Sequence, residues 1–198
     1  MVVPVKRLEL AKSRLAAYGD ATRQALALAF AADVVVAVSL VATVLVVTDD
    51  ERAAALLSSL GARVVADDPD AGLNPALEHG VELLRESTPD LAVATISADL
   101  PSLLAPDLVA VLGRVPLAGR GFVADLAGTG TTLLAAGPGI ALQPSYGPSS
   151  RAHHLASGAV ELVAPESVRR DVDTPEDLEH AAELGVGPHT TAALQEVW

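Results

Sequence analysis

Short runs of β-branched and aliphatic residues alternate along the chain with longer stretches rich in alanine and leucine. This alternation is typical of a parallel sheet covered by helices, so it predicts an α/β fold with a mostly parallel sheet. The predicted strands are Val2–Val5, Thr43–Thr48, Arg63–Ala66, Leu91–Ser97, Gly121–Ala124 and Thr132–Ala136.

Residues that commonly cap helices stand where the apolar stretches begin. Thr174 precedes Pro175, Glu176 and Asp177, which is the composition of a capped helix start with proline at the first helical position. Further caps are predicted at Asp20 for a helix over Ala21–Val38, at Asp49 or Asp50 for a helix to Leu60, and at Asn74 before Pro75 for a helix to Arg85.

The pattern contains no internal repeat and no low-complexity linker, so we predict one domain over residues 1–187. The segment from Gly128 to Gly158 is rich in Gly, Pro and Ser, and a small lobe of loops and a hairpin is expected there. From Gly185 onward the chain looks like a loosely attached tail, which we assign to residues 188–198.

Composition narrows the classes of ligand. Of the 198 residues, 51% are hydrophobic but only 3% are aromatic, so the core must consist mainly of Ala, Val and Leu. A formal net charge of −12 repels nucleic acid and anionic membranes, so a phosphate-bearing ligand should be small and held by a local cationic patch or a metal. The absence of cysteine excludes disulfides, thiolate metal sites and a cysteine nucleophile. With no secretory leader and no uninterrupted apolar run of about 20 residues, a cytoplasmic protein without a membrane partner is expected.

Both lysines of the chain, Lys6 and Lys12, lie in its opening segment together with Arg7 and Arg14. The four charges follow an apolar strand directly, and a lysine ammonium suits a moving phosphate. An anion site is therefore one interpretation, and a solvated surface cluster is the other.

Asp99 follows the strand Leu91–Ser97 and is predicted to lie at the carboxyl end of a central strand, where open α/β sheets bind ligands. A turn former or a helix cap would also explain it. Asp171 and Asp173 alternate around Val172 and face one way in an extended chain. They could share a hard cation such as Mg²⁺ with Asp99, or else Asp173 serves helix capping and Asp171 pairs with Arg170.

Two glycine-containing segments suggest a close approach of the backbone to a small anion. Asp125–Thr132 is a poor dinucleotide fingerprint, because Leu133 stands where a third glycine is needed and a strand follows. In Ser145–His154, Ser149 or Ser150 could cap a helix that points at an anion, with a plain turn as the alternative. His153 and His154 lack metal-ligand spacing and are placed on a helix surface or behind the site. The polar loop Asp67–Leu77 could read a nucleobase, although capping alone explains Asn74.

Together these motifs resemble, in order and spacing, the 2-phospho-L-lactate / phosphoenolpyruvate guanylyltransferase family of coenzyme F-420 biosynthesis. The resemblance covers Val2 to about Gly187. It rests on Pro4-Val5-Lys6 with Ala11-Lys12-Ser13-Arg14-Leu15, Gly72-Leu73-Asn74, Ala98-Asp99-Leu100-Pro101, Gly128-Thr129-Gly130-Thr131, Tyr146-Gly147-Pro148-Ser149-Ser150 with His153 or His154, and Asp171-Val172-Asp173-Thr174-Pro175-Glu176-Asp177-Leu178.

The resemblance implies a single-domain, three-layer α/β/α nucleotidyltransferase fold, Rossmann-like in its layers, that transfers GMP from GTP to a phosphorylated three-carbon acid. It implies Mg²⁺ on Asp99 and Asp171 and acid binding by Thr131, Gly147 and Ser150. Lys6, Lys12 and Arg14 match the basic segment that would hold the GTP phosphates. We assign Lys12 to catalysis and Lys6, Arg14 and Asn74 to nucleotide binding. The long glycine-rich loop of the wider superfamily is missing before the first lysines, so the side chains must supply more of the positive charge.

The acceptor phosphate is already a nucleophile, so the expected reaction needs alignment and charge neutralisation but no covalent intermediate. Phosphoenolpyruvate is the preferred acceptor, because the Gly-Thr-Gly-Thr and Tyr-Gly-Pro-Ser-Ser segments look most like the actinobacterial branch of the family. The alternatives are 2-phospho-L-lactate, a non-catalytic nucleotide-binding paralogue, and a dinucleotide-dependent oxidoreductase, which would want a glycine-rich turn where this chain has lysines. We expect a monomer or a homodimer.

Overall fold

The computed structural model describes residues 1–68, 71–86 and 88–196. Within them, seven strands form one sheet in the order β3-β2-β1-β4-β6-β5-β7. All neighbours pair in parallel except β6, which is antiparallel to both β4 and β5. The strands are β1 (Val2–Pro4), β2 (Leu45–Val47), β3 (Arg63–Val65), β4 (Val93–Ile96), β5 (Arg120–Ala124), β6 (Thr131–Ala136) and β7 (Val160–Glu161). The predicted strands are confirmed, each ending within a residue or two of the expected position.

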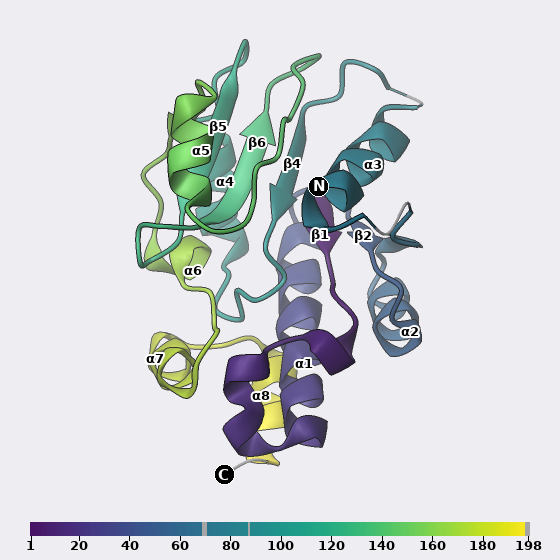
Figure 1. Cartoon of the computed structure of the whole chain (residues 1–198), viewed down its shortest axis with the longest axis vertical. Helices are drawn as coiled ribbons and strands as arrows, with labels where there is room; N and C mark the ends of the chain where they lie inside the picture. Colours follow the sequence, from purple (N-terminus) through teal and green to yellow (C-terminus); the bar gives the residue numbers. More distant parts are fainter. Residues whose placement is uncertain (69–70, 87, 197–198) are drawn as a thin grey trace.

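Helices cover both faces of this sheet (Figure 1). Their bounds are α1 (Asp20–Ser39), α2 (Glu51–Ser59), α3 (Leu73–Arg85), α4 (Ala105–Leu112), α5 (Ser150–Ala156), α6 (Glu166–Arg169), α7 (Pro175–Leu184) and α8 (Pro188–Gln195), with the 3₁₀ helices η1 (Leu8–Leu10) and η2 (Ser13–Tyr18).

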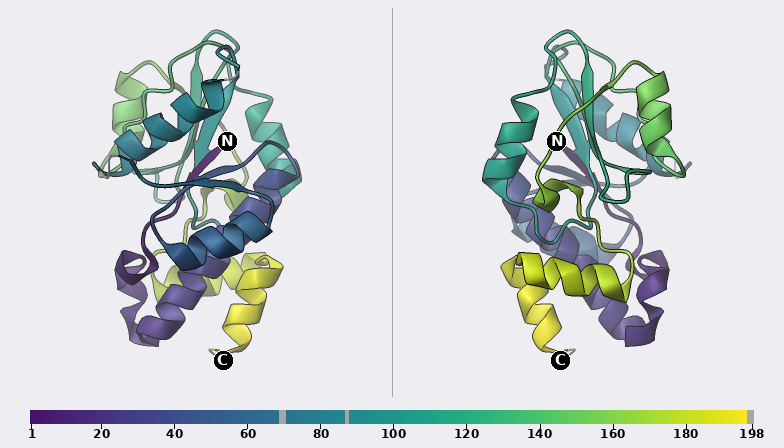
Figure 2. Two further views of the ribbon diagram at one scale, coloured as in Figure 1. Left: turned by 90° about the vertical axis from the view of Figure 1, so that its right-hand side faces the viewer. Right: turned by 90° about the vertical axis from the view of Figure 1, so that its left-hand side faces the viewer.

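Alternation along the strands divides the core into two layers. Val3 and Val46 lie in a cluster with residues of α1, α2, α4 and α6. Their strand neighbours Val2 and Leu45 pack on the other face with residues of α3. The sheet is seen nearly edge-on between these helices in Figure 2, so the expected three-layer α/β/α sandwich is confirmed.

Helix α1 is by length and mean hydropathy apolar enough to cross a membrane, but 67% of that stretch is buried inside the protein. Its second half, with Val34 and Val35, belongs to the core cluster on one face of the sheet, and Phe30 packs in a further cluster. Burial in this fold therefore accounts for the apolar composition of α1.

A third cluster lies below the sheet, where η2, the first turns of α1, α7 and α8 come together (Figure 1). It contains Leu15, Phe30, Val172, Leu178 and Leu194, and the first four have no exposed surface. Leu15 follows Lys12 by three positions, and Val172 separates Asp171 from Asp173. Packing of these two apolar residues in one cluster therefore brings the opening segment and the aspartate pair together.

Two of the predicted helix caps are confirmed. The carboxylate of Asp50, not Asp49, accepts the amides of Arg52 and Ala53 at 3.0 Å each. Thr174 and Asp177 form a capping box at the start of α7.

The caps predicted at Asp20 and Asn74 are wrong. Gly19 and Gly72 occupy the N-cap positions of α1 and α3, both at positive φ. Asp20 is the first residue inside α1, and its carboxylate lies 3.2 Å from Arg23. Each polar side chain found a partner outside the cap, and glycine adopts the required backbone conformation without side-chain strain.

The segment from Gly128 to Gly158 is not a separate lobe. Its strand β6 lies between β4 and β5 in the centre of the sheet, and Leu133 and Leu134 on it have no exposed surface. The hairpin is therefore part of the core.

The predicted loose tail is also wrong for the described residues 188–196; residues 197 and 198 lie outside the described part of the chain. Helix α8 packs along α1, and its residue Thr190 is fully buried. The carboxylate of Asp33 on α1 accepts the amides of His189 at 3.0 Å and Thr190 at 2.8 Å. A buried carboxylate thus fixes the start of α8 through two charge-assisted hydrogen bonds.

Candidate active site

Two neighbouring cavities share part of their lining, the first at the carboxyl ends of β1, β2 and β4 and the second at the carboxyl end of β5. The first, of about 760 Å³, is lined on one side by the opening segment with Lys6 and Lys12, and on the other by Asp99 and Asp173. The second, of about 680 Å³, is lined by Asp125, Gly130 and Gly147 and by Arg170 and Asp171. Arg14 and Asp173 line both cavities. Asp99 thus lies in a cavity at the carboxyl end of β4, as predicted, and ligand binding there stays a prediction.

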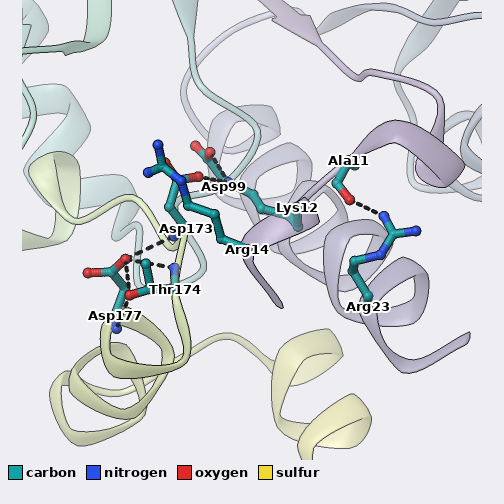
Figure 3. A network of polar contacts seen from close by, with 8 residues as sticks. All are labelled: Ala11, Lys12, Arg14, Arg23, Asp99, Asp173, Thr174 and Asp177. Carbon is teal, nitrogen blue, oxygen red and sulfur yellow. Dashed lines mark hydrogen bonds and ion pairs between the residues drawn. The ribbon is translucent and has the colours of Figure 1, made fainter. Parts of the chain in front are cut away.

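Lys12 is held between two carboxylates (Figure 3). Its ammonium donates a hydrogen bond to Asp99 and another, of 2.8 Å, to Asp173. The lysine side chain is only 11% exposed. Burial by itself would lower the pKa of Lys12, but the negative charges of Asp99 and Asp173 outweigh it and raise the pKa to about 12. Lys12 is therefore a fixed positive charge in the first cavity, in contact with Asp173, which lines both cavities.

Backbone contacts hold the two carboxylate segments in place. The amide of Val172 donates to the carbonyl of Asp99 at 3.0 Å. The amide of Asp173 donates to Asp177 at 3.1 Å, within the capping box of α7. Burial favours protonation of Asp177, but hydrogen bonds from Thr174 and Asp173 outweigh it and lower its pKa. The helix cap thus fixes the backbone of Asp173, while its side chain is left to bind Lys12.

Asp171 lines the second cavity and is half-buried. Burial raises the pKa of Asp171 to about 7, and the charges of Asp99 and Asp173 add to this effect. Arg170 is not its partner, because the guanidinium of Arg170 pairs with Glu166, at 2.6 Å from Nε. The interpretation of Asp171 as an exposed partner of Arg170 is therefore wrong.

Lys6 and Arg14 are two of the three exposed cations of the opening segment, Arg7 being the third. Both line the first cavity, and the Arg14 side chain is 71% exposed. Its guanidinium lies 3.5 Å from the Asp173 carboxylate. This ion pair forms part of the wall shared by the two cavities.

Asn74 lies close to the first cavity, next to the lining residue Leu73. Its side chain bonds the backbone of Tyr146 through both ends, donating to the carbonyl at 3.1 Å and accepting the amide at 2.8 Å. The amide group therefore ties α3 to the loop that carries Gly147. In the polar loop Asp67–Leu77, predicted as a possible contact for a nucleobase, Pro69 and Asp70 lie outside the described residues.

The three residues expected to bind the acid differ in position. Gly147 lines the second cavity at φ 126, a conformation that favours glycine. Thr131 and Ser150 are 7% and 1% exposed, and the Ser150 hydroxyl donates to that of Thr131 at 3.1 Å. These two hydroxyls belong to a buried layer next to the cavity.

His154 completes this layer and has no exposed surface. Its Nε2 accepts the amide of Ser145 at 3.0 Å, so Nδ1 carries the proton and donates to Thr131 at 2.9 Å. Burial, with Arg120 and His153 nearby, lowers the pKa of His154 to about 4 and keeps the ring neutral. Of the two predicted positions, the helix surface fits His153, which is exposed, and a place behind the site fits the buried His154.

The glycines of Asp125–Thr132 allow a close approach, and the group that approaches is a carboxylate of the chain itself. Asp125 accepts the amides of Thr129 and Gly130 at 2.8 Å each. A Cβ on residue 130 would collide with this carboxylate. The two amides are thereby engaged by Asp125.

The carboxylates fit a hard divalent cation. Oδ1 of Asp99 is buried and has no hydrogen-bond partner among the described residues, because Lys12 uses Oδ2. An orphaned buried carboxylate oxygen is costly unless a cation or water meets it. Across the described chain no three acidic or histidine side chains form a complete metal cage. Two protein carboxylates, completed by phosphate oxygens and water, are the arrangement typical of Mg²⁺.

Sequence reasoning underrated Asp173. The sequence assigns the metal to Asp99 and Asp171 and leaves Asp173 as the alternative. The side chain of Asp173 nevertheless contacts both Lys12 and Arg14 and lines both cavities. The signal that could have found it is the alternation Asp171-Val172-Asp173: burial of the valine turns both neighbouring carboxylates away from the core.

Comparison with known proteins identifies the family. The profile described as guanylyl transferase CofC like matches residues 1–197. A phosphoenolpyruvate guanylyltransferase of Streptomyces scabiei is 54% identical over 204 residues, covering 98% of this chain and 94% of the relative. One of Thermomonospora curvata is 53% identical over 197 residues, covering 97% and 86%.

Solved structures support the fold. A Desulfovibrio desulfuricans protein, described provisionally as a nucleotide-diphospho-sugar transferase, superimposes with a TM-score of 0.70 at 16% identity, covering 98% of this chain and 93% of the other. At this identity the likeness concerns the fold alone, which is that of nucleotidyltransferases. The profile match over residues 1–197 and the relatives above 50% identity show that the chain belongs to the guanylyl transferase CofC-like family.

Proposed function

We propose that this chain is a phosphoenolpyruvate guanylyltransferase, which transfers GMP from GTP to phosphoenolpyruvate in coenzyme F-420 biosynthesis. The products are enolpyruvoyl-2-diphospho-5'-guanosine and pyrophosphate. Family membership and the names of relatives at about half identity support the reaction class. The structural observation that carries the proposal is the pair of adjoining cavities that share Arg14 and Asp173, with Lys12 and Asp99 in the first and Asp171 in the second.

This arrangement suits a transfer between two phosphate-bearing substrates. GTP would occupy the first cavity, with its phosphates toward Lys6, Lys12 and Arg14. The acid would occupy the second, so that its phosphate faces the α-phosphorus of GTP across the shared wall. A phosphate oxygen of the acid forms the new bond to that phosphorus, and the bond to the bridging oxygen of pyrophosphate breaks. Alignment of the two groups supplies much of the rate, because it makes the reaction effectively unimolecular.

Lys12 would act on the charge that develops during transfer. Its ammonium is already desolvated and fixed, so little reorganisation is needed when negative charge grows on the leaving pyrophosphate. Arg14, which is exposed and bound to Asp173 only at 3.5 Å, is free to move toward a phosphate. The phosphate nucleophile needs no general base, in keeping with the neutral, buried His154.

Asp99 and Asp171 are the residues proposed to hold Mg²⁺, through the free oxygen of Asp99 and the half-buried carboxylate of Asp171. A bound Mg²⁺ supplies charge neutralisation on the phosphates of both substrates. Asp171 would lose its proton as the cation binds, since a positive charge favours the ionised carboxylate.

Recognition of the acid would combine the backbone at Gly147 with the buried hydroxyl layer. Ser150 and His154 both donate to the Thr131 oxygen, so the proton of the Thr131 hydroxyl is left to donate to a substrate oxygen. Asn74, proposed at first for nucleotide binding, would act on both sites through the loop of Tyr146 that it fixes. The net charge of −12 supports small ligands in place of nucleic acid or an anionic membrane. Action in the cytoplasm, as a monomer or homodimer, is part of the proposal.

The test is turnover with defined substrates. The purified protein is incubated with GTP, Mg²⁺ and either phosphoenolpyruvate or 2-phospho-L-lactate, and pyrophosphate release and product mass are followed. Phosphoenolpyruvate should be preferred by roughly 10- to 200-fold in kcat/KM, the range that small shape differences give. With both acids at equal concentration, a major product heavier by two hydrogen atoms would show that phospholactate is the acceptor. GTP binding without pyrophosphate release with either acid would identify a non-catalytic paralogue.

A further inference from the structure

Lys12 occupies an unusual backbone conformation. It lies at φ 53 and ψ 43, in the left-handed region, which side-chain-bearing residues rarely adopt. Such a residue persists only when its surroundings hold it in place. The chain also lacks the long glycine-rich loop that would accommodate this bend without strain. Some other group must therefore fix the backbone just before Lys12.

The guanidinium of Arg23 is that group (Figure 3). Arg23 lies in the first turn of α1, and its side chain is 7% exposed. It donates to the carbonyl of Leu8 at 3.2 Å, to that of Glu9 at 3.0 Å, and to that of Ala11. The Ala11 carbonyl belongs to the peptide unit that it shares with Lys12. The planar guanidinium reaches these three carbonyls from two separate nitrogens, whereas a lysine carries all its donors on one nitrogen.

A second contact fixes the same loop, and in this one a backbone amide of the loop donates the hydrogen bond. The carboxylate of Asp50 accepts the amide of Leu8 at 2.9 Å while it caps α2. Amides and carbonyls of residues 8–11 are thus anchored to two helices that pack on the sheet, and Lys12 follows directly. Its side chain then reaches the carboxylates across the cavity, 87 and 161 residues further along the chain.

We propose that Arg23 is a positioning residue for the active site: it fixes the backbone of residues 8–11 so that the Lys12 ammonium is held in the first cavity against Asp99 and Asp173. This inference rests on the role of Lys12 in the proposed function, but its first test needs no substrate. Arg23 itself does not touch either substrate in this proposal. It replaces with one buried side chain what a glycine-rich loop achieves with backbone amides.

The chain offers a simple readout, because Lys6 and Lys12 are its only lysines. Brief acetylation of the intact protein with acetic anhydride, followed by peptide mass spectrometry, gives both rates in one sample, with the exposed Lys6 as internal reference. Lys12 is buried and ion-paired, so it should react at least ~10-fold more slowly than Lys6. In Arg23→Gln the ratio of Lys12 to Lys6 labelling should rise at least ~3-fold, because the loop opens locally.

Two further variants keep the experiment decisive. Arg23→Lys keeps the positive charge but carries all its donors on one nitrogen, so it should give an intermediate ratio, and it carries the test if Arg23→Gln does not show native circular dichroism. Arg114→Gln is the matched control, since Arg114 is exposed and donates to the carbonyl of Val163 at 2.6 Å, outside residues 8–11 and their two anchors. An unchanged labelling ratio in folded Arg23→Gln and Arg23→Lys would overturn the proposal.

A double-mutant cycle then tests the link to turnover. Arg23→Gln alone should lower kcat by roughly 10- to 100-fold with a smaller change in KM for GTP. In a Lys12→Ala background the same change should lower kcat by less than ~2-fold, because the ammonium that Arg23 positions is already absent. Additive losses would show that Arg23 acts by another route. Failure of the proposed function would appear differently, as no turnover in the unmodified protein with the labelling result unaffected.

Discussion

The Lys12 ammonium donates a hydrogen bond of 2.8 Å to Oδ1 of Asp173, a residue 161 positions further along the chain. The same ammonium is ion-paired with Asp99, one of the two residues proposed to hold Mg²⁺. Lys12 and a divalent cation would therefore share one carboxylate, that of Asp99. The positive charge that stabilises the site without metal should have to give up part of this contact when a metal binds.

Metal affinity measures this competition. Lys12→Met removes a unit positive charge next to Asp99, so Mn²⁺ should bind tighter by roughly 10-fold, or about 1.4 kcal/mol. Isothermal titration calorimetry in the absence of nucleotide gives the dissociation constant. Lys6→Met is the control, and the exposed Lys6 should change the affinity little. Weaker Mn²⁺ binding by Lys12→Met would mean that Lys12 and the cation do not compete.

Removal of the Lys12 charge should lower turnover, although it should tighten metal binding. Lys12→Ala is expected to lower kcat by roughly 100- to 1,000-fold, the usual loss when one fixed charge-stabilising donor is removed. Lys12→Arg should recover little, because a planar fork cannot take the place of a compact ammonium between two carboxylates. Steady-state pyrophosphate release gives kcat and KM for GTP. Unchanged release by the alanine variant would leave Lys12 with a structural role.

Substitution of the proposed metal ligands, Asp99 and Asp171, should change the Mg²⁺ dependence more than substitution of Asp173. Asp99→Asn and Asp171→Asn are each expected to lower kcat by at least ~100-fold, since an amide leaves the cation's charge uncompensated. Their Mg²⁺ dependence should shift to higher concentration, with native circular dichroism. Asp173→Asn, which loses contacts to Lys12 and Arg14, should be affected less in its Mg²⁺ dependence. The reverse order would move the metal assignment to Asp173.

His154 should make stability depend on pH. Its pKa falls from 6.5 to about 4 on folding, so below pH 6.5 the unfolded chain binds a proton that the folded protein does not. Stability is complete above pH 6.5 and is lost as the pH falls toward 4, by roughly 2–3 kcal/mol. Urea unfolding of wild type and His154→Gln should show a difference in unfolding free energy that narrows over this range. The exposed neighbour provides the control, since His153→Gln should keep the wild-type pH dependence.

Asp33 should contribute to stability far from the site. Asp33→Ala leaves the amides of His189 and Thr190 without their acceptor, and should lower the free energy of unfolding by about 2–3 kcal/mol. Glu179→Ala, at an exposed position on α7, should change it by less than about 0.5 kcal/mol. Equal effects of the two substitutions would mean that Asp33 does not hold α8 in place and that residues 188–196 are loosely attached.

The sequence by itself determined the elements and the place of the site. Strand positions, the capping box at Thr174 and the position of Asp99 at a strand end follow from hydrophobic period and local hydrogen bonding, which involve residues a few positions apart. The order of six motifs also determined the family, because each motif kept its position relative to the others.

The tertiary structure alone decided which polar groups meet. Asn74 and Asp20 have the composition of helix caps, yet Asn74 bonds Tyr146 and Asp20 pairs with Arg23. The hydrophobic cluster around Leu15 and Val172 sets the partners of Lys12, which come from segments 87 and 161 residues away. A side chain takes the best partner within reach in the folded chain, and that reach depends on packing between distant segments, which local sequence pattern does not encode.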